Sequence, residues 1–374
     1  MRDVLRTALC DLLGIEYPVI QSGMGSVAGP DLVAEVSRAG GLGILAGLNV
    51  PPEELRSRIR HIRELTDRPF GVNLWLHTEL RPPADPATIS EGRLAAVHSV
   101  LNGFRARLGL PARAGRPGPV PDIISAQLEV ILEERPPVFS IGLGDPGPDL
   151  VARCRAQGIK VVAMVATVQD ARAVAASGVD AIVAQGSEAG GHRSTWVKRP
   201  SPDAASVGTM ALVPQIVDAV EVPVVAAGGI SDGRGLVAAL ALGAVGILLG
   251  TRFVATRESM APEFWKKSLL EREGDDTTVT DAFSGLWNRT LRNTYTAEYQ
   301  ASGAPVLPPL LQTRAAQDIV EEARRRGEGE YFPMLAGQGV GLVRDLPGAG
   351  EVVETIVREA RVVLAGLPRR VRIA

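Results

Sequence analysis

The stretch PVVAAGGISDGRGLVAALALGAVGILLGTRF, residues 223–253, decides the fold. It reads as an apolar strand over Pro223–Ala227, a double glycine, a helix over Gly233–Leu242 and a second apolar strand over Val245–Leu249. Both strands are continuous apolar runs, which is typical of parallel strands that are covered on both faces. The stretch therefore predicts a βαβ unit whose turns are rich in glycine.

The same pattern recurs along the chain. Six further strands are predicted at Pro18–Gln21, Leu42–Leu45, Phe70–Leu76, Val138–Ile141, Lys160–Val165 and Ala181–Gln185. Helical patterns separate them, and Gly40, Gly178 and Gly243 are expected to end helices in the left-handed conformation. Eight such units with glycines at the carboxyl ends of strands favour an α/β fold of the (β/α)8 TIM-barrel type. An open, doubly wound sheet is the structural alternative.

Two stretches interrupt the alternation. Residues 77–136 read as a proline-rich excursion that ends in a helix over Asp122–Glu134. Residues 256–346 look helical and contain no strong strand pattern. We therefore expect residues 1–255 together with 347–374 to form the barrel, and 256–346 to form a smaller helical region for substrate binding or closure over its mouth. The amphipathic stretch Glu351–Ala365 would close the barrel.

Composition excludes several classes of protein. Of the 374 residues, 45% are hydrophobic and 22% charged, and 40 basic residues nearly balance 42 acidic ones, so no nucleic-acid or membrane partner is expected. Cys10 and Cys154 cannot build a disulfide scaffold or a zinc site, so we expect no metal and a reducing, cytoplasmic setting. The longest apolar run, Leu236–Gly250, is too short for a confident membrane span.

Glycines after two neighbouring strands predict an anion site. Gly228 and Gly229 follow one strand, and Gly250 and Thr251 follow the next, so amides and one hydroxyl are available to a phosphate. A helix start near Asp232 would assist. In TIM barrels, the loops after strands seven and eight commonly bind phosphate.

Other polar residues are predicted at the same end of the barrel. In AQGSEAGGHRS, residues 184–194, Gln185 ends a strand, Gly190 and Gly191 leave room for a flat ligand, and His192 follows. An imidazole there serves as an acid, a base or a charge stabiliser near neutral pH.

Two more side chains are candidates for ligand contact, and the remaining histidines are weaker ones. Asn73 lies in the strand FGVNLWL and needs a polar partner, and Met24 follows the first strand. His61 and His98 lie in helical patterns and are expected to be structural, whereas the role of His77 is left open.

The combination of these segments resembles the nitronate monooxygenases, once called 2-nitropropane dioxygenases. The matching segments are GIEYPVIQSGMG, AGGLGIL, FGVN, VDAIVAQGSEAGGH, PVVAAGGISDGRG, ALGAVGILLGTRF and AGQGVGLVRDLP. The resemblance implies an FMN-dependent barrel enzyme that oxidises alkyl nitronates with O2 to a carbonyl compound and nitrite.

The resemblance also implies roles for individual residues. Gly23 and Met24 would face the flavin ring, and Gly190 and Gly191 would flank the cofactor. Asn73 and Gln185 would hydrogen-bond the ring or the ribityl chain, and His192 would be the catalytic histidine. The phosphate would be held by Gly228, Gly229, Gly250 and Thr251.

Alternative functions remain open at this level. The scaffold also resembles FMN-dependent reductases that use NAD(P)H and act on quinones or on enoyl and acyl thioesters of CoA or a carrier protein. Arg289, Arg292 and Arg324–Arg326 could contact phosphates in such an enzyme, although a solvated face explains them as well. A catalytically idle barrel or a non-flavin phosphate-binding isomerase is a third class. The sequence leaves a homodimer open.

Overall fold

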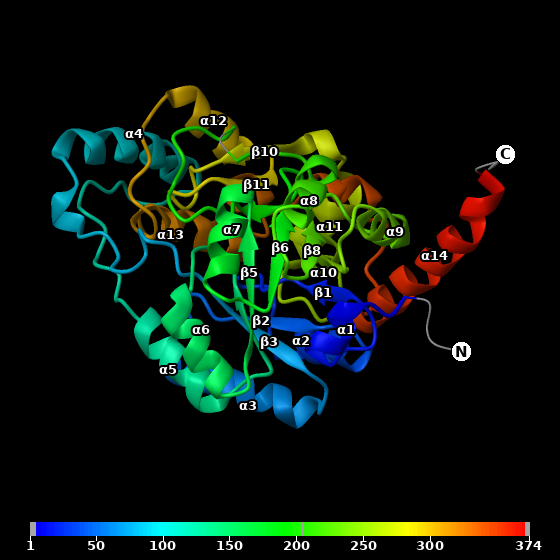
Figure 1. Ribbon diagram of the computed structural model, residues 1–374. Coiled ribbons are helices and arrows are strands. Elements are labelled where there is room, and N and C mark those ends of the chain that lie inside the picture. Colours follow the sequence, from blue (N-terminus) through cyan, green and yellow to red (C-terminus); the bar gives the residue numbers. More distant parts are fainter. Residues whose placement is uncertain (1–4, 204, 371–374) are drawn as a thin grey trace.

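The centre of the molecule is a barrel of parallel strands (Figure 1), and the computed structural model describes residues 5–203 and 205–370. The eight strands are β1 (Val19–Gln21), β2 (Gly43–Ala46), β3 (Phe70–Leu74), β4 (Val138–Ile141), β5 (Lys160–Val165), β6 (Ala181–Gln185), β8 (Val224–Ala227) and β9 (Gly246–Leu249). Their order is β1–β9–β8–β6–β5–β4–β3–β2, and a parallel bridge between Ile20 and Leu42 joins the two edges. All predicted strands are present, and the (β/α)8 barrel is confirmed.

One helix follows each strand and covers the barrel from outside. These helices are α2 (Pro30–Arg38), α3 (Pro52–Leu65), α5 (Ile124–Glu134), α6 (Gly147–Ala156), α7 (Val168–Ala176), α8 (Thr209–Val217), α9 (Gly233–Ala241) and α14 (Ala349–Arg370). The closing helix α14 packs against both α9 and α2, and its C-terminal half projects from the body (Figure 1). Within the described residues, no helix is both long and apolar enough to cross a bilayer.

Side chains of successive strand residues point alternately to two hydrophobic clusters, one inside the barrel and one beneath the helices. On β5, Val162 and Met164 belong to the cluster inside the barrel, whereas Val161, Ala163 and Val165 pack in the cluster beneath the helices. The short helix α1 (Ala8–Leu13) joins the inner cluster through Leu9 and Leu13. The strands are apolar on both faces because both faces are buried, as the continuous apolar runs predicted.

The three predicted glycine helix ends adopt the expected conformation. Gly40, Gly178 and Gly243 have φ values of +88°, +87° and +91°. In this left-handed region a side chain would collide with the backbone, so glycine lets the chain reverse directly from a helix into the next strand.

Helices are the main regular structure of residues 256–346, as expected, but the region also contributes strands. The short helix α10 (Thr251–Val254) ends just before this region. The helices of the region are α11 (Glu263–Glu271), α12 (Thr294–Ser302) and α13 (Leu311–Arg326), with short 3-10 turns η2 (Gly274–Asp276), η3 (Gly329–Tyr331) and η4 (Gln338–Leu342). Strands β10 (Thr277–Thr280) and β11 (Asn288–Leu291) form an antiparallel sheet with β7 (Gly191–His192). No sequence pattern predicted this sheet, because each of its strands is too short to show a clear period.

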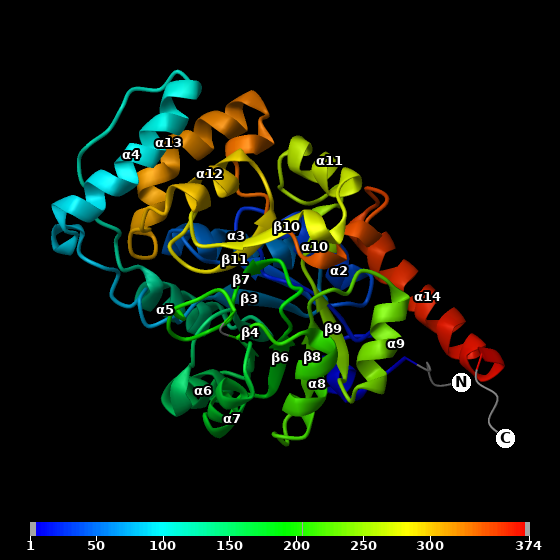
Figure 2. The same ribbon diagram turned by 90° about the horizontal axis from the view of Figure 1, so that it is seen from above.

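The excursion after β3 packs against the 256–346 region. It contains the 3-10 turn η1 (Pro86–Thr88) and α4 (Glu91–Arg107), which lies beside α12 and α13 in both views (Figures 1 and 2). Phe104 of α4 packs against Tyr295 and Tyr331 with ring centroids 4.7 and 5.7 Å apart. The division into a barrel unit and a 256–346 unit stays a prediction, and α4 is an element that links the two.

Candidate active site

A single pocket at the carboxyl ends of the strands collects the predicted site residues. It has a volume of about 1070 Å³, part of it open to solvent. Its lining includes every candidate named from the sequence: Gly23, Met24, Asn73, Gln185, Gly190, Gly191, His192, Gly228, Gly229, Gly250 and Thr251. Their individual roles remain predictions, but the barrel brings them together from five separate stretches of chain because parallel strands end on one face.

The glycine pair after β8 offers free donors at one end of the pocket. Gly228 and Gly229 have φ values of +110° and +70°. In the described part of the chain, neither of their amides donates to another protein group. A Cβ on Gly228 would lie 2.9 Å from Thr209 Oγ1, so a side chain would collide there. These loops therefore have the donors and the space that an anion requires.

Thr251 connects this end of the pocket to a late glycine-rich turn. Its Oγ1 accepts a hydrogen bond from the Gly337 amide at 2.9 Å, which leaves the hydroxyl hydrogen for a ligand. Nearby, Ser231 Oγ donates to the Gly339 carbonyl at 2.9 Å. The turn from Gly337 to Gly339 thus packs across both glycine loops.

We expected the start of α9 to assist the anion site, but its first amides already have other partners. Asp232 accepts hydrogen bonds from the amides of Arg234 and Gly235, at 2.9 and 3.4 Å. The Gly233 amide donates to the Glu359 carboxylate of α14 at 3.0 Å. Carboxylates therefore already satisfy the first-turn donors of this helix, and their negative charge opposes a second anion.

Asn73 and Gln185 are largely engaged with the protein. Asn73 Nδ2 donates to Ser140 Oγ at 3.0 Å and to the Ser140 carbonyl at 3.2 Å, which leaves Oδ1 as an acceptor at the pocket. Gln185 donates to the His192 carbonyl at 2.8 Å and accepts from the Ser194 amide at 2.9 Å. Gln185 therefore holds the segment around His192 in place, and one of its N–H groups remains for a ligand.

The other glycines permit close approach of backbone or ligand. A Cβ on Gly23 would lie 2.4 Å from Asn73 Cβ, and one on Gly190 would lie 2.4 Å from the Gly337 nitrogen. Gly191, at φ +77°, faces open space. A Cβ on Gly250 would meet Met24 Sδ at 3.6 Å, so the thioether lies beside the anion loops. At these positions the absence of a side chain lets a ligand approach the backbone closely.

His192 occupies the pocket at the edge of the three-stranded sheet. Its Nε2 lies 2.8 Å from Ser284 Oγ, and its ring packs edge-on against Trp75 with centroids 4.6 Å apart. Although the ring is only half-buried, its exposed part faces the pocket rather than bulk solvent. Burial lowers the pKa of His192 to about 4, and nearby His77 adds to this effect. The imidazole is therefore neutral at pH 7 and does not supply a positive charge.

Other side chains with reactive groups are structural or less well placed. His61 contacts Glu64 on α3 at 3.0 Å, and His98 contacts the Gly115 carbonyl at 2.8 Å. Burial raises the pKa of the Cys154 thiol to about 11, which disfavours a nucleophile. His77 is fully buried, and its Nε2 has no hydrogen-bond partner in the described residues.

Several residues in or beside the pocket were not identified from the sequence. Trp75 directly follows β3 and packs against His192 in the pocket lining. Ser284 contacts His192 from the turn between β10 and β11. Gly337 and Gly339 close the anion end. The late segment AGQGVG carried a usable signal, since two spaced glycines after a helical region again suggest close backbone approach. Ser284 had no local signal.

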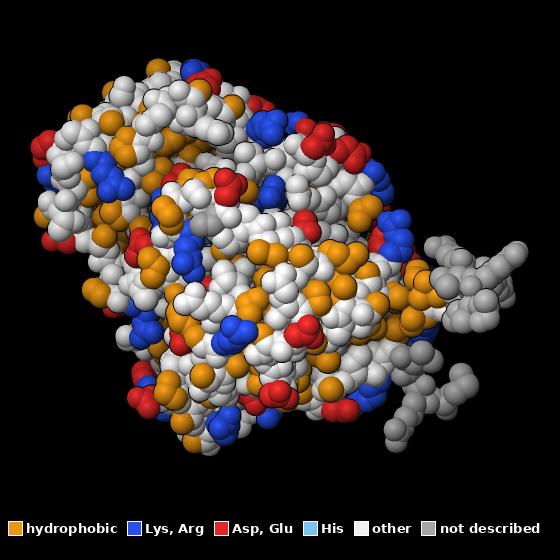
Figure 3. Space-filling view, turned by 45° about the horizontal axis from the view of Figure 1, so that its top comes forward, with side chains coloured by type: hydrophobic (Ala, Val, Ile, Leu, Met, Phe, Trp, Pro, Cys, Tyr) orange, Lys and Arg blue, Asp and Glu red, His pale blue; other side chains and the backbone are white. Residues whose placement is uncertain are grey.

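The pocket lining carries no charged side chain within the described residues, since none of its members is Lys, Arg, Asp or Glu. On the face shown in Figure 3, basic and acidic side chains are interspersed and neither sign forms one large patch. Two of the arginines considered as phosphate contacts, Arg325 and Arg326, pair with Glu322 instead.

Comparisons with known proteins agree with this geometry. The family model described as nitronate monooxygenase matches residues 6–359. A probable nitronate monooxygenase of Staphylococcus aureus (strain Newman) is 33% identical over 95% of this chain and 97% of its own. The crystal structure of a nitroalkane oxidase from Streptomyces ansochromogenes superposes with a TM-score of 0.86 at 36% identity, covering 96% of this chain and 100% of that one.

A second group of solved structures is also similar. FabK from Thermotoga maritima superposes with a TM-score of 0.76 at 31% identity, covering 98% of this chain and 100% of that one. Because the family model spans nearly the whole chain and the relatives match over their full length, the family and the enzyme class are established. The protein is an oxidoreductase that belongs to the nitronate monooxygenase family.

Proposed function

We propose that the pocket binds FMN and that the enzyme oxidises alkyl nitronates with O2 to a carbonyl compound and nitrite. The observation that carries the proposal is the pocket itself. It holds a neutral histidine, several glycines and a double glycine whose amides donate to no other group in the described residues. Family membership and the similarity to a nitroalkane oxidase support the choice of reaction.

The residues present fit FMN in three places. The amides of Gly228 and Gly229 and the hydroxyl of Thr251 would hold the phosphate. Asn73 Oδ1 would accept from a ring N–H, and the remaining Gln185 N–H would donate to a ring acceptor. Gly23, Gly190 and Gly191 would leave space for the ring, with Met24 beside it. When bound, FMN would supply the redox centre that accepts electrons from the substrate and passes them to O2.

The chain's own residues would orient the substrate and exclude water. His192 projects into the pocket beside Trp75, where it can hydrogen-bond the nitro group. Leu143, Met164 and Trp265 make much of the remaining lining apolar. Burying a charge without a partner is costly, so the pocket favours a substrate whose only charge is the nitronate itself.

The test is oxygen consumption and nitrite release by the purified holoenzyme with propyl-1-nitronate. Turnover well above that of free FMN is expected, together with a yellow protein that shows flavin absorbance. Propionate-3-nitronate, which carries an additional carboxylate, is expected to have a kcat/KM about tenfold lower, because no cation lines the pocket to pair with that group. Failure to oxidise either nitronate would overturn the proposal.

A reductase function is the second candidate, and the similarity to FabK favours it. Anaerobic mixing with NADH or NADPH separates the two. Rapid bleaching of the flavin absorbance would indicate a reductase, whereas no bleaching together with fast nitronate turnover would indicate a monooxygenase.

A further inference from the structure

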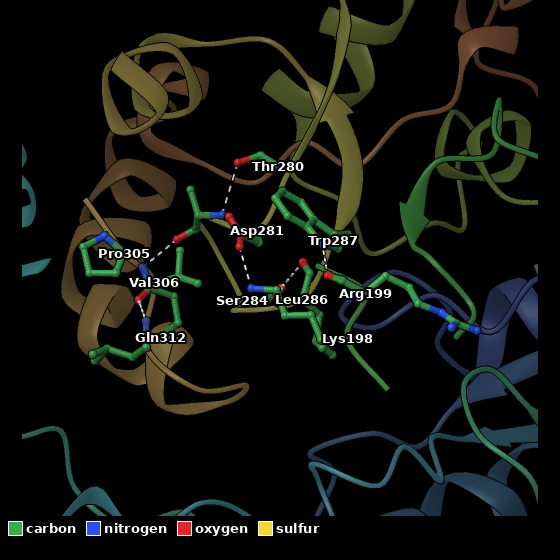
Figure 4. A network of polar contacts seen from close by, with 12 residues as sticks. Lys198, Arg199, Thr280, Asp281, Ser284, Leu286, Trp287, Pro305, Val306 and Gln312 are labelled. Atoms are coloured by element: carbon green, nitrogen blue, oxygen red, sulfur yellow. Dashed lines mark hydrogen bonds and ion pairs between the residues drawn. The ribbon is translucent and has the colours of Figure 1, made fainter. Parts of the chain in front are cut away.

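The turn between β10 and β11 presents a serine to the active-site histidine. Within this turn, the amides of Ser284 and Gly285 donate to the Asp281 carbonyl at 3.3 and 2.8 Å. The Asp281 carboxylate pairs with Lys198 Nζ at 2.5 Å, which ties the turn to the segment that follows β7 (Figure 4). Trp287 Nε1 reinforces this link by donating to the Arg199 carbonyl at 2.8 Å. The turn that carries the serine is therefore anchored to the segment that follows β7.

The position of His192 is fixed by strand pairing and by ring packing. His192 and Asn288 are paired residues of the β7–β11 ladder, and the imidazole packs against Trp75. With Nε2 at Ser284 Oγ, the other ring nitrogen, Nδ1, makes no hydrogen bond to any described residue. It is also not among the buried polar atoms that lack a partner, so Nδ1 is accessible from the pocket that the ring lines.

The surroundings of Ser284 determine whether Ser284 or His192 donates the hydrogen bond between them. A serine hydroxyl has one hydrogen to donate and two lone pairs to accept with. Two N–H groups point at this Oγ, the Leu286 amide at 3.4 Å and Asn288 Nδ2 at 3.5 Å. If His192 Nε2 also donated, three donors would compete for two lone pairs.

The opposite direction of the hydrogen bond gives every polar group around Ser284 Oγ a partner. If Ser284 donates to His192 Nε2, its lone pairs accept from Leu286 and Asn288. The Leu286 carbonyl, 3.2 Å from Ser284 Oγ, keeps a donor in any case, because Asn288 Nδ2 donates to it at 3.0 Å. The contact to His192 is also the shortest that the hydroxyl makes, at 2.8 Å.

We infer that Ser284 is a positioning residue that donates its hydroxyl hydrogen to His192 Nε2 and so holds His192 as the Nδ1–H tautomer, with a hydrogen-bond donor facing the pocket. The consequence for substrate choice rests on the proposed function. An Nδ1–H group stabilises the negative oxygen of a nitronate. It has no free lone pair with which to remove the C–H proton of a neutral nitroalkane. The enzyme is therefore specialised for the preformed anion.

The tautomer is read directly by nitrogen NMR on purified protein labelled with [15N]histidine. The His192 signals are assigned by their loss in His192→Asn. We expect Nδ1 to be of the protonated, pyrrole type and Nε2 of the unprotonated type at pH 7, and this preference to weaken in Ser284→Ala. A protonated Nε2 with an unprotonated Nδ1 in the unmodified protein would overturn the inference.

Kinetics on matched variants test the consequence. Ser284→Ala is expected to lower kcat/KM for propyl-1-nitronate about tenfold, the loss of one hydrogen bond to a charged group. It should not lower kcat/KM for neutral 1-nitropropane. Ser284→Thr keeps a hydroxyl and should restore the nitronate value. Ser268→Ala removes a helix-bound hydroxyl of α11 and should change neither value.

Two outcomes count against the inference. In the first, Ser284→Ala lowers kcat/KM equally for both substrates, as general damage to the site would. In the second, Ser284→Ala leaves both kcat/KM values unchanged, as Ser268→Ala is expected to do. If the unmodified enzyme oxidises neither compound, the proposed function fails, while the NMR measurement still decides the tautomer.

Discussion

Gly228 keeps the anion end of the pocket open at the scale of one residue. In Gly228→Ala, the new Cβ would lie 2.9 Å from Thr209 Oγ1 and 3.1 Å from the Ala189 nitrogen, at a backbone φ of +110°. The loop must shift, and its amides would turn away from the phosphate. We expect FMN affinity to fall at least tenfold, measured by quenching of flavin fluorescence.

Gly178→Ala is the matched control for this change. Gly178 is also left-handed, at φ +87°, but its nearest contact would be Val151 Cγ1 at 3.7 Å, far from crowding. Both variants carry a backbone strain of about 1 kcal/mol, so both lose stability. A comparable loss of FMN affinity in the two would contradict a specific role for Gly228.

His192 couples the active site to pH. Burial keeps its folded-state pKa near 4, against an ordinary value of 6.5. Between these values the unfolded chain binds a proton that the folded chain does not, so stability falls as pH drops below about 6.5. From pH 7 to pH 5, the free energy of unfolding should fall by about 1–2 kcal/mol more in the unmodified protein than in His192→Asn. Urea unfolding at both pH values measures this; equal losses would refute the assignment.

At the scale of elements, α9 separates helix stability from ligand binding. Asp232→Ala removes the side chain that caps the Arg234 and Gly235 amides, and should cost about 1 kcal/mol in urea unfolding. FMN affinity should stay unchanged, because the phosphate donors are predicted to be the Gly228 and Gly229 amides. Thr167→Ala removes the equivalent cap of α7 and serves as the control. A fall in FMN affinity in Asp232→Ala but not in Thr167→Ala would show that the start of α9 contributes to phosphate binding.

The three-stranded sheet shows how a small element carries chemistry. β7 consists of Gly191 and His192 alone, and pairing with β11 sets the direction of the imidazole. A two-residue strand has no period that a sequence pattern can reveal, and its partner comes from a region that reads as helical. The histidine was therefore found from its position after β6, whereas its strand and its supporting serine were not.

At the scale of the whole molecule, a buried ion pair joins the excursion after β3 to the 256–346 region. Arg105 is fully buried on α4 and contacts both Asp318 oxygens, at 3.0 and 3.1 Å, and the Ala315 carbonyl at 2.6 Å. Arg105→Leu would remove the buried partner of Asp318 and leave it only the exposed Arg113, at 3.0 Å. This change should cost about 3 kcal/mol, measured by urea unfolding.

Arg107→Leu tests whether burial is the cause. Arg107 lies on the same helix and pairs with Glu298 at 2.6 Å, but both side chains are exposed, so solvent screens the pair. We expect a much smaller loss of stability than for Arg105→Leu. Similar losses in the two variants would show that side-chain packing rather than the buried ion pair holds α4 in place.

Features that depend on neighbours along the chain could be predicted from the sequence. Continuous apolar runs predicted all eight strands, and the glycines at 40, 178 and 243 marked helix ends, because both signals arise from local burial and local backbone conformation. The candidate site residues also followed, since the carboxyl ends of parallel strands must meet on one face of a barrel.

The contacts that hold those residues, and the neighbours that complete the pocket, depend on how distant elements pack. Ser284 meets His192 across 92 positions, and Gly337 meets Thr251 across 86. The carboxylate of Glu359 reaches the Gly233 amide from α14 and removes α9 from the anion site. Such contacts leave no periodic trace in the sequence, because they depend on the packing of distant elements rather than on the conformation of adjacent residues.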